Sequence, residues 1–151
     1  MDQVRWGIIG CGDVTEVKSG PAFNKVPHSE LAAVMRRDAL KAEDYAKRHG
    51  VKKWYSDAAQ LINDPEVNAI YVATPPSTHL LYALAAIDAG KPVYVEKPMP
   101  MNVTEARQMS AHAKDKNVNL SVAHYRRQLP LLLKINSLLQ EKVIGVILFV
   151  Q

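Results

Sequence analysis

The chain has 151 residues, of which 48% are hydrophobic and 23% charged, a composition that excludes a disordered or fibrous protein and predicts one globular domain. The single cysteine excludes an internal disulfide and fits a reducing compartment. The formal net charge is +4, but the basic residues stand singly or in pairs among acidic ones, so we expect no nucleic-acid partner.

The apolar runs are too short to predict a membrane-spanning helix. The longest, at 143–150, has eight residues, whereas a transmembrane helix needs about 18 or more. The first residues also lack the order of a charged and then an apolar segment that is typical of a signal peptide. We therefore expect a soluble cytoplasmic protein with no membrane partner.

Short apolar runs alternate with helical patterns along the chain. The runs predict β-strands at residues 4–9, 31–35, 53–55, 69–72, 93–95 and 120–122. Most are apolar on both faces, as strands are when helices cover both sides of a parallel sheet. A further strand-like run at 146–151 is either a last strand of this sheet or the start of a second domain, and we favour the second domain.

Residues that favour helix ends mark the segments between the strands. The residues that can cap helices are Asp38, Asp57, Ser77 or Thr78, and Asn102 with Glu105, and these helices are predicted to end at His49, Asn63, Ala89 and Asn117. Pro130 suits the first turn of a last helix that ends at about Glu141. The first helix is expected to break early, at Gly20-Pro21. This alternation predicts an α/β fold, a doubly wound parallel sheet with right-handed crossovers.

The strongest local signal is a glycine-rich segment that follows the first strand and opens a helix, Gly10-Cys11-Gly12-Asp13-Val14. Gly10 permits a tight turn, and Gly12 lets the backbone approach a pyrophosphate while the helix N-terminus supplies N–H donors. Thr15 stands where the full fingerprint has a third glycine or alanine. The segment predicts nucleotide binding, with a purely structural turn as the alternative.

Two arginines, Arg36 and Arg37, end the second predicted strand, where a dinucleotide-binding sheet contacts the adenosine ribose. An acid at this place binds the ribose 2′-hydroxyl of NAD, whereas guanidinium groups suit the 2′-phosphate of NADP. The pair therefore predicts NADP as the preferred cofactor over NAD. Asp38 keeps NAD open as an alternative, in which both arginines are only surface charges.

Further motifs lie at the ends of the later strands. They are Ala73-Thr74-Pro75-Pro76 with His79, Ala89-Gly90-Lys91-Pro92-Val93, Glu96-Lys97-Pro98, and Val122-Ala123-His124-Tyr125-Arg126-Arg127 followed by Pro130. Together with the glycine turn, and in this order, they resemble the Gfo/Idh/MocA family of NAD(P)-dependent oxidoreductases, which includes glucose–fructose oxidoreductase and inositol dehydrogenase. The resemblance covers the whole chain.

The resemblance implies an NAD(P)-binding Rossmann domain over residues 1–143 and the start of a truncated C-terminal α+β substrate domain at 144–151. Family members have about twice the length of one such domain, so the chain is expected to be the cofactor-binding half of a longer enzyme. By position, Lys97 is implied to be the catalytic residue beside the nicotinamide. Glu96 is implied to orient Lys97 or to contact the nicotinamide ribose, and Pro98 to fix the loop, where a cis peptide is allowed.

The same resemblance assigns roles to five other residues. Thr74 and Pro75 are implied to flank the nicotinamide half of the cofactor. His79 either donates to the cofactor or pins the loop, and the two roles stay open. Tyr125 and Arg127 are implied to face the substrate pocket, where Arg127 binds an anionic or hydroxyl-rich substrate or pairs with an acid of the second domain.

The function implied is hydride transfer between the nicotinamide and a secondary alcohol or carbonyl of a sugar, polyol or related small molecule, in a homo-oligomer. The isolated fragment is expected to catalyse little. No metal site is expected, because no His, Cys, Asp or Glu cluster has metal-ligand spacing. The alternatives are a non-catalytic NADP-binding sensor or regulator, an NAD-dependent glycosidase, and a small ligand-binding module without a nucleotide.

Overall fold

The computed structural model of the chain describes residues 2–143 and 145. Its elements, in chain order, are β1 (Val4–Ile9), the π-helical turn η1 (Thr15–Ser19), α1 (Gly20–Phe23), β2 (Ser29–Met35), α2 (Ala39–His49), β3 (Lys53–Tyr55), α3 (Ala58–Asn63), β4 (Ala69–Val72), the 3₁₀ turn η2 (Pro76–Thr78), α4 (His79–Asp88), β5 (Val93–Val95), α5 (Val103–Asp115), β6 (Leu120–Val122), the 3₁₀ turn η3 (Tyr125–Gln128) and α6 (Pro130–Gln140).

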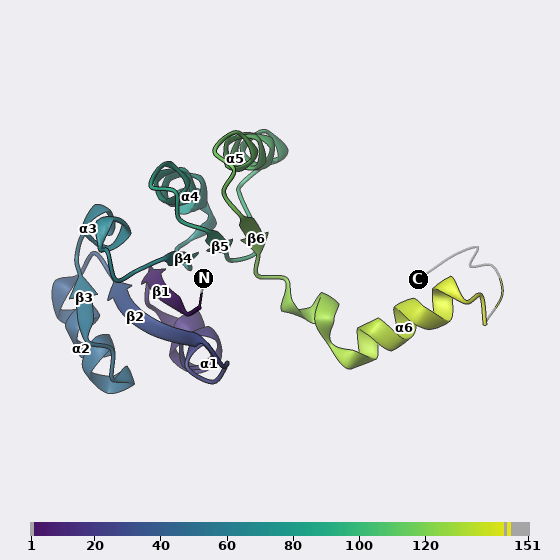
Figure 1. Cartoon of the computed structure of the whole chain (residues 1–151), viewed down its shortest axis with the longest axis horizontal. Helices are drawn as coiled ribbons and strands as arrows, with labels where there is room; N and C mark the ends of the chain where they lie inside the picture. The colour runs from purple at the N-terminus through teal and green to yellow at the C-terminus, as the bar shows by residue number, and fades with distance from the viewer. Residues whose placement is uncertain (1, 144, 146–151) are drawn as a thin grey trace.

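Six strands form one sheet in the order β3-β2-β1-β4-β5-β6, and every neighbouring pair is parallel. Helices α3, α4 and α5 lie on one side of the sheet, and α1 and α2 lie on the other (Figure 1). The predicted doubly wound α/β fold is therefore confirmed. Among these six strands only β2 differs from its predicted bounds, starting at Ser29 because this residue pairs with Val4.

Two buried hydrophobic clusters fill the spaces between the sheet and its helices. Consecutive residues of β1 face opposite sides, since Ile8 belongs to the cluster under α1 and α2 and Ile9 to the cluster under α3, α4 and α5. Tyr45 of α2 and Met109 of α5 are fully buried members of the two clusters. Burial on both faces explains why the strand segments are apolar throughout rather than alternating.

The break predicted at Gly20-Pro21 is wrong. The helical path is continuous over residues 13–23, because the Gly20 N–H donates to the Thr15 carbonyl, five residues earlier, in a π-type turn. Pro21 then lies in the first turn of α1, where its missing N–H is tolerated. Gly20 is needed for packing, since a Cβ there would overlap the Thr15 carbonyl and the Tyr45 hydroxyl.

Side chains cap three helices as predicted, and the capping residues are Asp38, Asp57 and Asn102. The cap predicted at Ser77 or Thr78 is wrong, because no side chain caps α4. The Thr78 hydroxyl instead lies 2.8 Å from Thr74 Oγ1 and 2.9 Å from the Pro75 carbonyl oxygen. A single residue before a helix can cap it or hold the preceding loop, and here it holds the loop.

The last helix, α6, extends away from the sheet and buries none of its residues (Figure 1). The start of a second domain predicted at 144–151 lies outside the described residues, apart from Gly145. Among the described helices, none combines the length and the apolar character that a bilayer crossing requires.

Charged groups join the first helical turns to the end of α2. The guanidinium of Arg48 donates to both oxygens of Glu16 at 2.7 and 2.8 Å, and His49 Nε2 lies 2.8 Å from Glu16 Oε2. Tyr45 donates its hydroxyl to the Thr15 carbonyl at 2.8 Å. Arg48 lowers the pKa of the Glu16 carboxyl to about 2, so this acid is ionised in the folded chain.

We expect Glu16→Gln to lower the free energy of unfolding by about 1 kcal/mol at pH 7, a value discounted because Arg48 is half exposed. The folded pKa of Glu16 lies below its unfolded value of 4.5, so the stabilisation is present above that pH and is lost as pH falls toward about 2. Urea unfolding at pH 7 and pH 3 measures the effect. The prediction is contradicted if the difference in unfolding free energy between the unaltered chain and Glu16→Gln does not shrink at pH 3. It is also contradicted if Glu43→Gln lowers the unfolding free energy by the same amount.

Candidate functional site

The centre of the sheet is where the chain reverses its direction of winding. Strands β1 and β4 are neighbours, but the chain continues from β1 toward β2 and from β4 toward β5 on the other side. The loops after these two strands therefore separate and leave a crevice at the carboxyl edge. In open α/β sheets this is the place where ligands bind.

Gly10, the first residue after β1, lies against Thr74, which follows β4. The φ of Gly10 is +92°, and a Cβ built there would stand 2.9 Å from the Thr74 backbone nitrogen. The N–H groups of Gly10 and Cys11 both donate to the Met35 carbonyl, at 2.9 and 3.1 Å, which ties the turn to the end of β2. The turn therefore requires glycine, and it presents backbone rather than side chain to the crevice.

Thr15 occupies the place of the third glycine in the dinucleotide fingerprint and is fully buried. Its hydroxyl accepts from the Gly12 N–H at 3.0 Å and donates to the Gly12 carbonyl at 2.8 Å. No hydrogen bond within the described residues engages the N–H groups of Asp13 and Val14, which come next at the start of the helical path. These two donors, with the positive end of the helix, suit the oxygens of a pyrophosphate.

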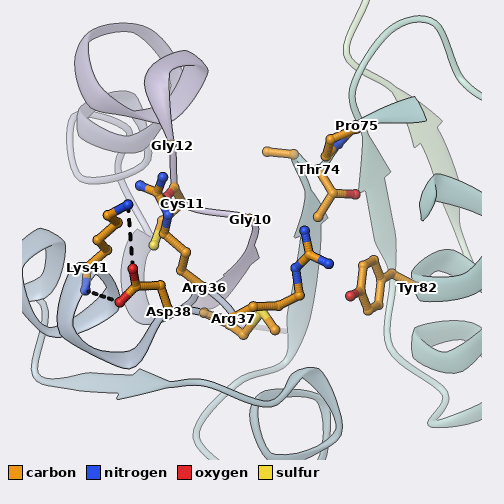
Figure 2. Close-up of a pocket in the computed structure, with 12 residues that line it drawn as sticks. Gly10, Cys11, Gly12, Arg36, Arg37, Asp38, Lys41, Thr74, Pro75 and Tyr82 are labelled. Carbon is orange, nitrogen blue, oxygen red and sulfur yellow. Dashed lines mark hydrogen bonds and ion pairs between the residues drawn. The ribbon is translucent and has the colours of Figure 1, made fainter. Parts of the chain in front are cut away.

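A cleft of about 340 Å³ opens at this crevice (Figure 2). It brings together seven of the residues predicted to bind the cofactor, namely Gly10, Cys11, Gly12, Arg36, Arg37, Thr74 and Pro75. It also contains three residues that the sequence analysis did not single out, Met35, Lys41 and Tyr82. Lys41 could have been noticed, because it lies on the first turn of the helix that Asp38 caps.

Arg36 and Arg37 point in different directions in Figure 2. Arg36 turns back to the glycine turn, where its Nη1 donates to the Cys11 carbonyl at 3.3 Å. Arg37 is exposed and extends toward Thr74 and Tyr82 across the cleft. The two guanidinium groups therefore occupy two sides of one cavity instead of forming a single pair.

The carboxylate of Asp38 is already engaged in the structure. It accepts the Lys41 N–H at 3.2 Å and lies 3.5 Å from Lys41 Nζ. The Lys41 N–H holds the pKa of Asp38 below its usual value, so the carboxylate is ionised but paired. Its first role is to cap α2, which weakens the alternative in which Asp38 serves the ribose hydroxyl of NAD.

Cys11 is a packing residue within the turn. Its side chain is 1% exposed, and burial raises the pKa of the thiol to about 11. The thiol is therefore protonated at neutral pH and poorly nucleophilic. What Cys11 offers the cleft is its backbone, whose carbonyl receives Arg36.

His79 is fully buried, and each of its ring nitrogens faces backbone carbonyls. Nε2 lies 2.6 Å from the Thr74 oxygen, and Nδ1 lies 2.8 Å from the Met99 oxygen and 3.0 Å from the Pro98 oxygen. This geometry leaves neither ring nitrogen free for a cofactor, because both face backbone carbonyls. It favours the other predicted role, in which His79 pins the loops after β4 and β5 together.

A second cavity, of about 650 Å³, lies beside the carboxyl ends of β5 and β6. Five predicted residues line it, namely Asp13, Val14, Glu96, Lys97 and Tyr125. The peptide bond between Lys97 and Pro98 is cis, as the sequence allows. Lys97 is exposed and takes part in no ion pair among the described residues. Its ammonium group is therefore available to a ligand in this cavity.

Cations gather around the phenol of Tyr125. The neighbouring Arg126 lowers the pKa of Tyr125, and Lys18 and Lys97 act in the same direction. Arg127 lies in an adjoining open cavity of about 1010 Å³, which Tyr125 also lines. Of the two residues predicted to meet the substrate, Tyr125 therefore shares a cavity with Lys97, Arg127 lines only the adjoining one, and neither lines the first cleft.

The structure adds one buried polar residue that the sequence analysis missed. The Tyr71 hydroxyl, on β4, donates to Glu96 Oε1 at 2.6 Å. Tyr71 stands inside an apolar strand segment and looks like an ordinary core residue in the sequence. Only the pairing of β4 with β5 brings its hydroxyl to the acid that follows β5. Within the described residues no group of three or more His, Cys, Asp or Glu side chains is placed to hold a metal ion.

The chain is similar to known proteins over most of its length. A model of the oxidoreductase family with an NAD-binding Rossmann fold, Gfo/Idh/MocA, matches residues 4–124. The chain is 56% identical over 143 residues to "Oxidoreductase P35" of Formosa agariphila, covering 95% of this chain and 44% of that protein. It is 33% identical over 154 residues to trans-1,2-dihydrobenzene-1,2-diol dehydrogenase of Sus scrofa, covering 98% of this chain and 44% of that protein.

Among solved structures, the chain is similar to KijD10, a 3-ketoreductase from Actinomadura kijaniata in complex with TDP-benzene and NADP. The TM-score is 0.87 at 28% identity, over 95% of this chain and 45% of that one. The chain thus spans less than half the length of the relatives that it matches.

We expect His79→Ala to lower the free energy of unfolding by about 2–4 kcal/mol, because it leaves a cavity and unpaired buried carbonyl groups. His112→Ala is the control, since His112 is a partly exposed partner of Asp88 and its loss should cost less than about 0.5 kcal/mol. Urea unfolding of the three proteins measures both values. Equal losses in the two variants contradict the structural role of His79.

Proposed function

The chain belongs to the Gfo/Idh/MocA oxidoreductase family, and from that membership we propose that it is the cofactor-binding half of an NADP-preferring dehydrogenase or reductase. The reaction proposed is hydride transfer between the nicotinamide and a secondary alcohol or carbonyl of a sugar, polyol or related small molecule. The observation that carries this proposal is the side-chain-free turn of Gly10 at the point where the sheet reverses its winding, with Lys97 in the adjacent cavity.

The residues present fit a dinucleotide. Thr74 occupies the space that a Cβ at Gly10 would need, so position 10 can present only a glycine backbone to the cleft. The N–H groups of Asp13 and Val14 suit the pyrophosphate, and the first cleft, with Tyr82, takes the adenosine half. The second cavity, with Lys97, takes the nicotinamide half.

Preference for NADP rests on the charges around the first cleft. Arg36, Arg37 and Lys41 line it, and its one acid, Asp38, is engaged by Lys41. A 2′-phosphate therefore meets cations and no free carboxylate, whereas the 2′-hydroxyl of NAD finds no unengaged acid to accept its proton. The similar 3-ketoreductase KijD10 was crystallised in complex with NADP, which supports the same preference here.

When bound, the nicotinamide ring supplies or accepts the hydride at its C4 atom. The protein's own contribution at the reacting oxygen comes from Lys97, whose ammonium stabilises developing negative charge or gives and takes a proton. Tyr125 lines the same cavity as Lys97 and Arg127 lines the adjoining one, and both suit the hydroxyl groups of a polyol or an anionic group. A free Lys97 in a cavity also favours an enzyme over a non-catalytic sensor, which needs no acid at this place.

We expect this chain to bind NADPH about tenfold or more tightly than NADH, because two guanidinium groups and an ammonium group meet the 2′-phosphate. Arg36→Ala and Arg37→Ala should each remove most of that preference without weakening NADH, and Arg107→Ala, on the distant α5, should not. Fluorescence titration with both dinucleotides measures it. Equal affinities, or tighter binding of NADH, in the unaltered chain would contradict the role of the arginines.

In the full-length protein, we expect Lys97→Met to lower kcat by about 100-fold or more while the NADPH affinity stays within about threefold. The reason is that the ammonium acts on the reacting oxygen rather than on the cofactor. Lys25→Met, on the surface after α1, is the control and should keep full activity. A Lys97 variant that retains kcat contradicts the catalytic assignment.

A further inference from the structure

Tyr71 is a polar residue in the middle of the sheet whose hydroxyl has a defined partner. It lies on β4 between β1 and β5, and its side chain is 0% exposed. Phe23 and Tyr94 pack against the ring, each with a centroid distance of 5.4 Å. A phenylalanine would fill the same space, so packing alone does not account for the hydroxyl, which costs free energy to bury unless it is hydrogen-bonded.

The hydroxyl joins three parts of the chain. It lies 2.6 Å from Glu96 Oε1, after β5, and 3.1 Å from Ser19 Oγ, at the end of η1. The other oxygen of Glu96, Oε2, accepts the backbone N–H of Lys97 at 3.0 Å. Both carboxylate oxygens are therefore fixed, one by Tyr71 and one by the backbone of the proposed catalytic lysine.

The phenol remains a donor over the whole working range of pH. Burial, together with the Glu96 carboxylate, holds the pKa of Tyr71 far above its usual value. The short distance to a carboxylate oxygen is typical of a charge-assisted hydrogen bond, the stronger class. Glu96 consequently has one strong anchor in the core of the sheet.

The π-type turn explains how Ser19 comes to this place. Its extra residue keeps the helical path continuous into α1, and the Ser19 hydroxyl lies 3.2 Å from the Val14 carbonyl as well as near Tyr71. Val14 begins the helix that follows the glycine turn and lines the second cavity. π-turns inside helices are frequent at functional sites. Through Ser19, the helix proposed to meet the pyrophosphate touches the same phenol that holds Glu96.

We propose that Tyr71 is a positioning residue for the nicotinamide half of the site. Its hydroxyl fixes the Glu96 carboxylate and, through that carboxylate, the backbone of Lys97. Ser19 is the second partner of the hydroxyl. The inference rests on the proposed function. Its effect is confined to the second cavity, because the adenosine cleft contains neither Tyr71, Glu96 nor Ser19. Removing the hydroxyl therefore weakens binding of the nicotinamide half of the dinucleotide and not of the adenosine half.

The test compares two ligands on the same chain, NADPH and its adenosine half, adenosine 2′,5′-bisphosphate. Tyr71→Phe should lower the affinity for NADPH by about threefold to tenfold, as loss of a hydrogen bond to a charged group does, and leave the bisphosphate affinity unchanged. Tyr94→Phe is the matched control, since it removes the same atom from the neighbouring ring, which has no side-chain hydrogen bond among the described residues.

Two further variants separate positioning from general damage to the fold. Ser19→Ala should lower the affinity for NADPH as well, by a smaller factor than Tyr71→Phe does. The double variant Glu96→Gln, Tyr71→Phe should lower the NADPH affinity by less than the product of the two single fold-changes, because both substitutions act through one contact.

Each outcome decides the proposal. If Tyr71→Phe lowers the affinity for both ligands alike, the hydroxyl has a structural role only. If it changes neither affinity, the hydroxyl has no role in binding. Both results overturn the inference. If the unaltered chain binds the bisphosphate but not NADPH, the nicotinamide half is not where the inference needs it, which overturns the inference but keeps the adenosine cleft. If it binds neither ligand, the proposed function fails first, and this result is distinct from any effect of the variants.

Discussion

The close approach of Gly10 to Thr74 is the constraint on which the site depends. A Cβ at Gly10 would meet the Thr74 backbone nitrogen at 2.9 Å, so the loops after β1 and β4 can lie this close only with glycine there. Both residues line the first cleft, which we propose for the adenosine half, whereas the second cavity lies on the side of β5 and β6. Buried hydrogen bonds of His79 then join the loops after β4 and β5.

Local patterns predicted the fold well because the forces that form its elements are local. Strands buried on both faces are continuous apolar runs, and the caps at Asp38, Asp57 and Asn102 are short-range hydrogen bonds. The same patterns failed where one residue has two uses. Gly20 indicated a helix break but is a close contact with Tyr45 in a continuous helix, and Thr78 indicated a cap but holds a loop.

The site was predictable to the extent that its residues follow strand ends, since parallel strands bring their carboxyl ends to one edge. This rule predicted that the glycine turn, Arg36, Thr74 and Lys97 lie at one edge of the sheet. It could not show that His79 turns inward, because burial of a polar ring depends on carbonyl groups of a loop 20 residues away. Nor could it distinguish Tyr71 from the apolar residues around it, since its partner Glu96 becomes its neighbour only through strand pairing.

The central claim, that this edge of the sheet is a dinucleotide site, is tested most directly by mapping where NADPH binds. Backbone amide NMR spectra of the isotope-labelled chain, recorded during a titration with NADPH, report every residue whose surroundings change. We predict saturable shifts concentrated at residues 10–15, 36–41, 74 and 96–97, with the amino ends of the strands unaffected. Shifts that concentrate elsewhere, or none at millimolar NADPH, would contradict it.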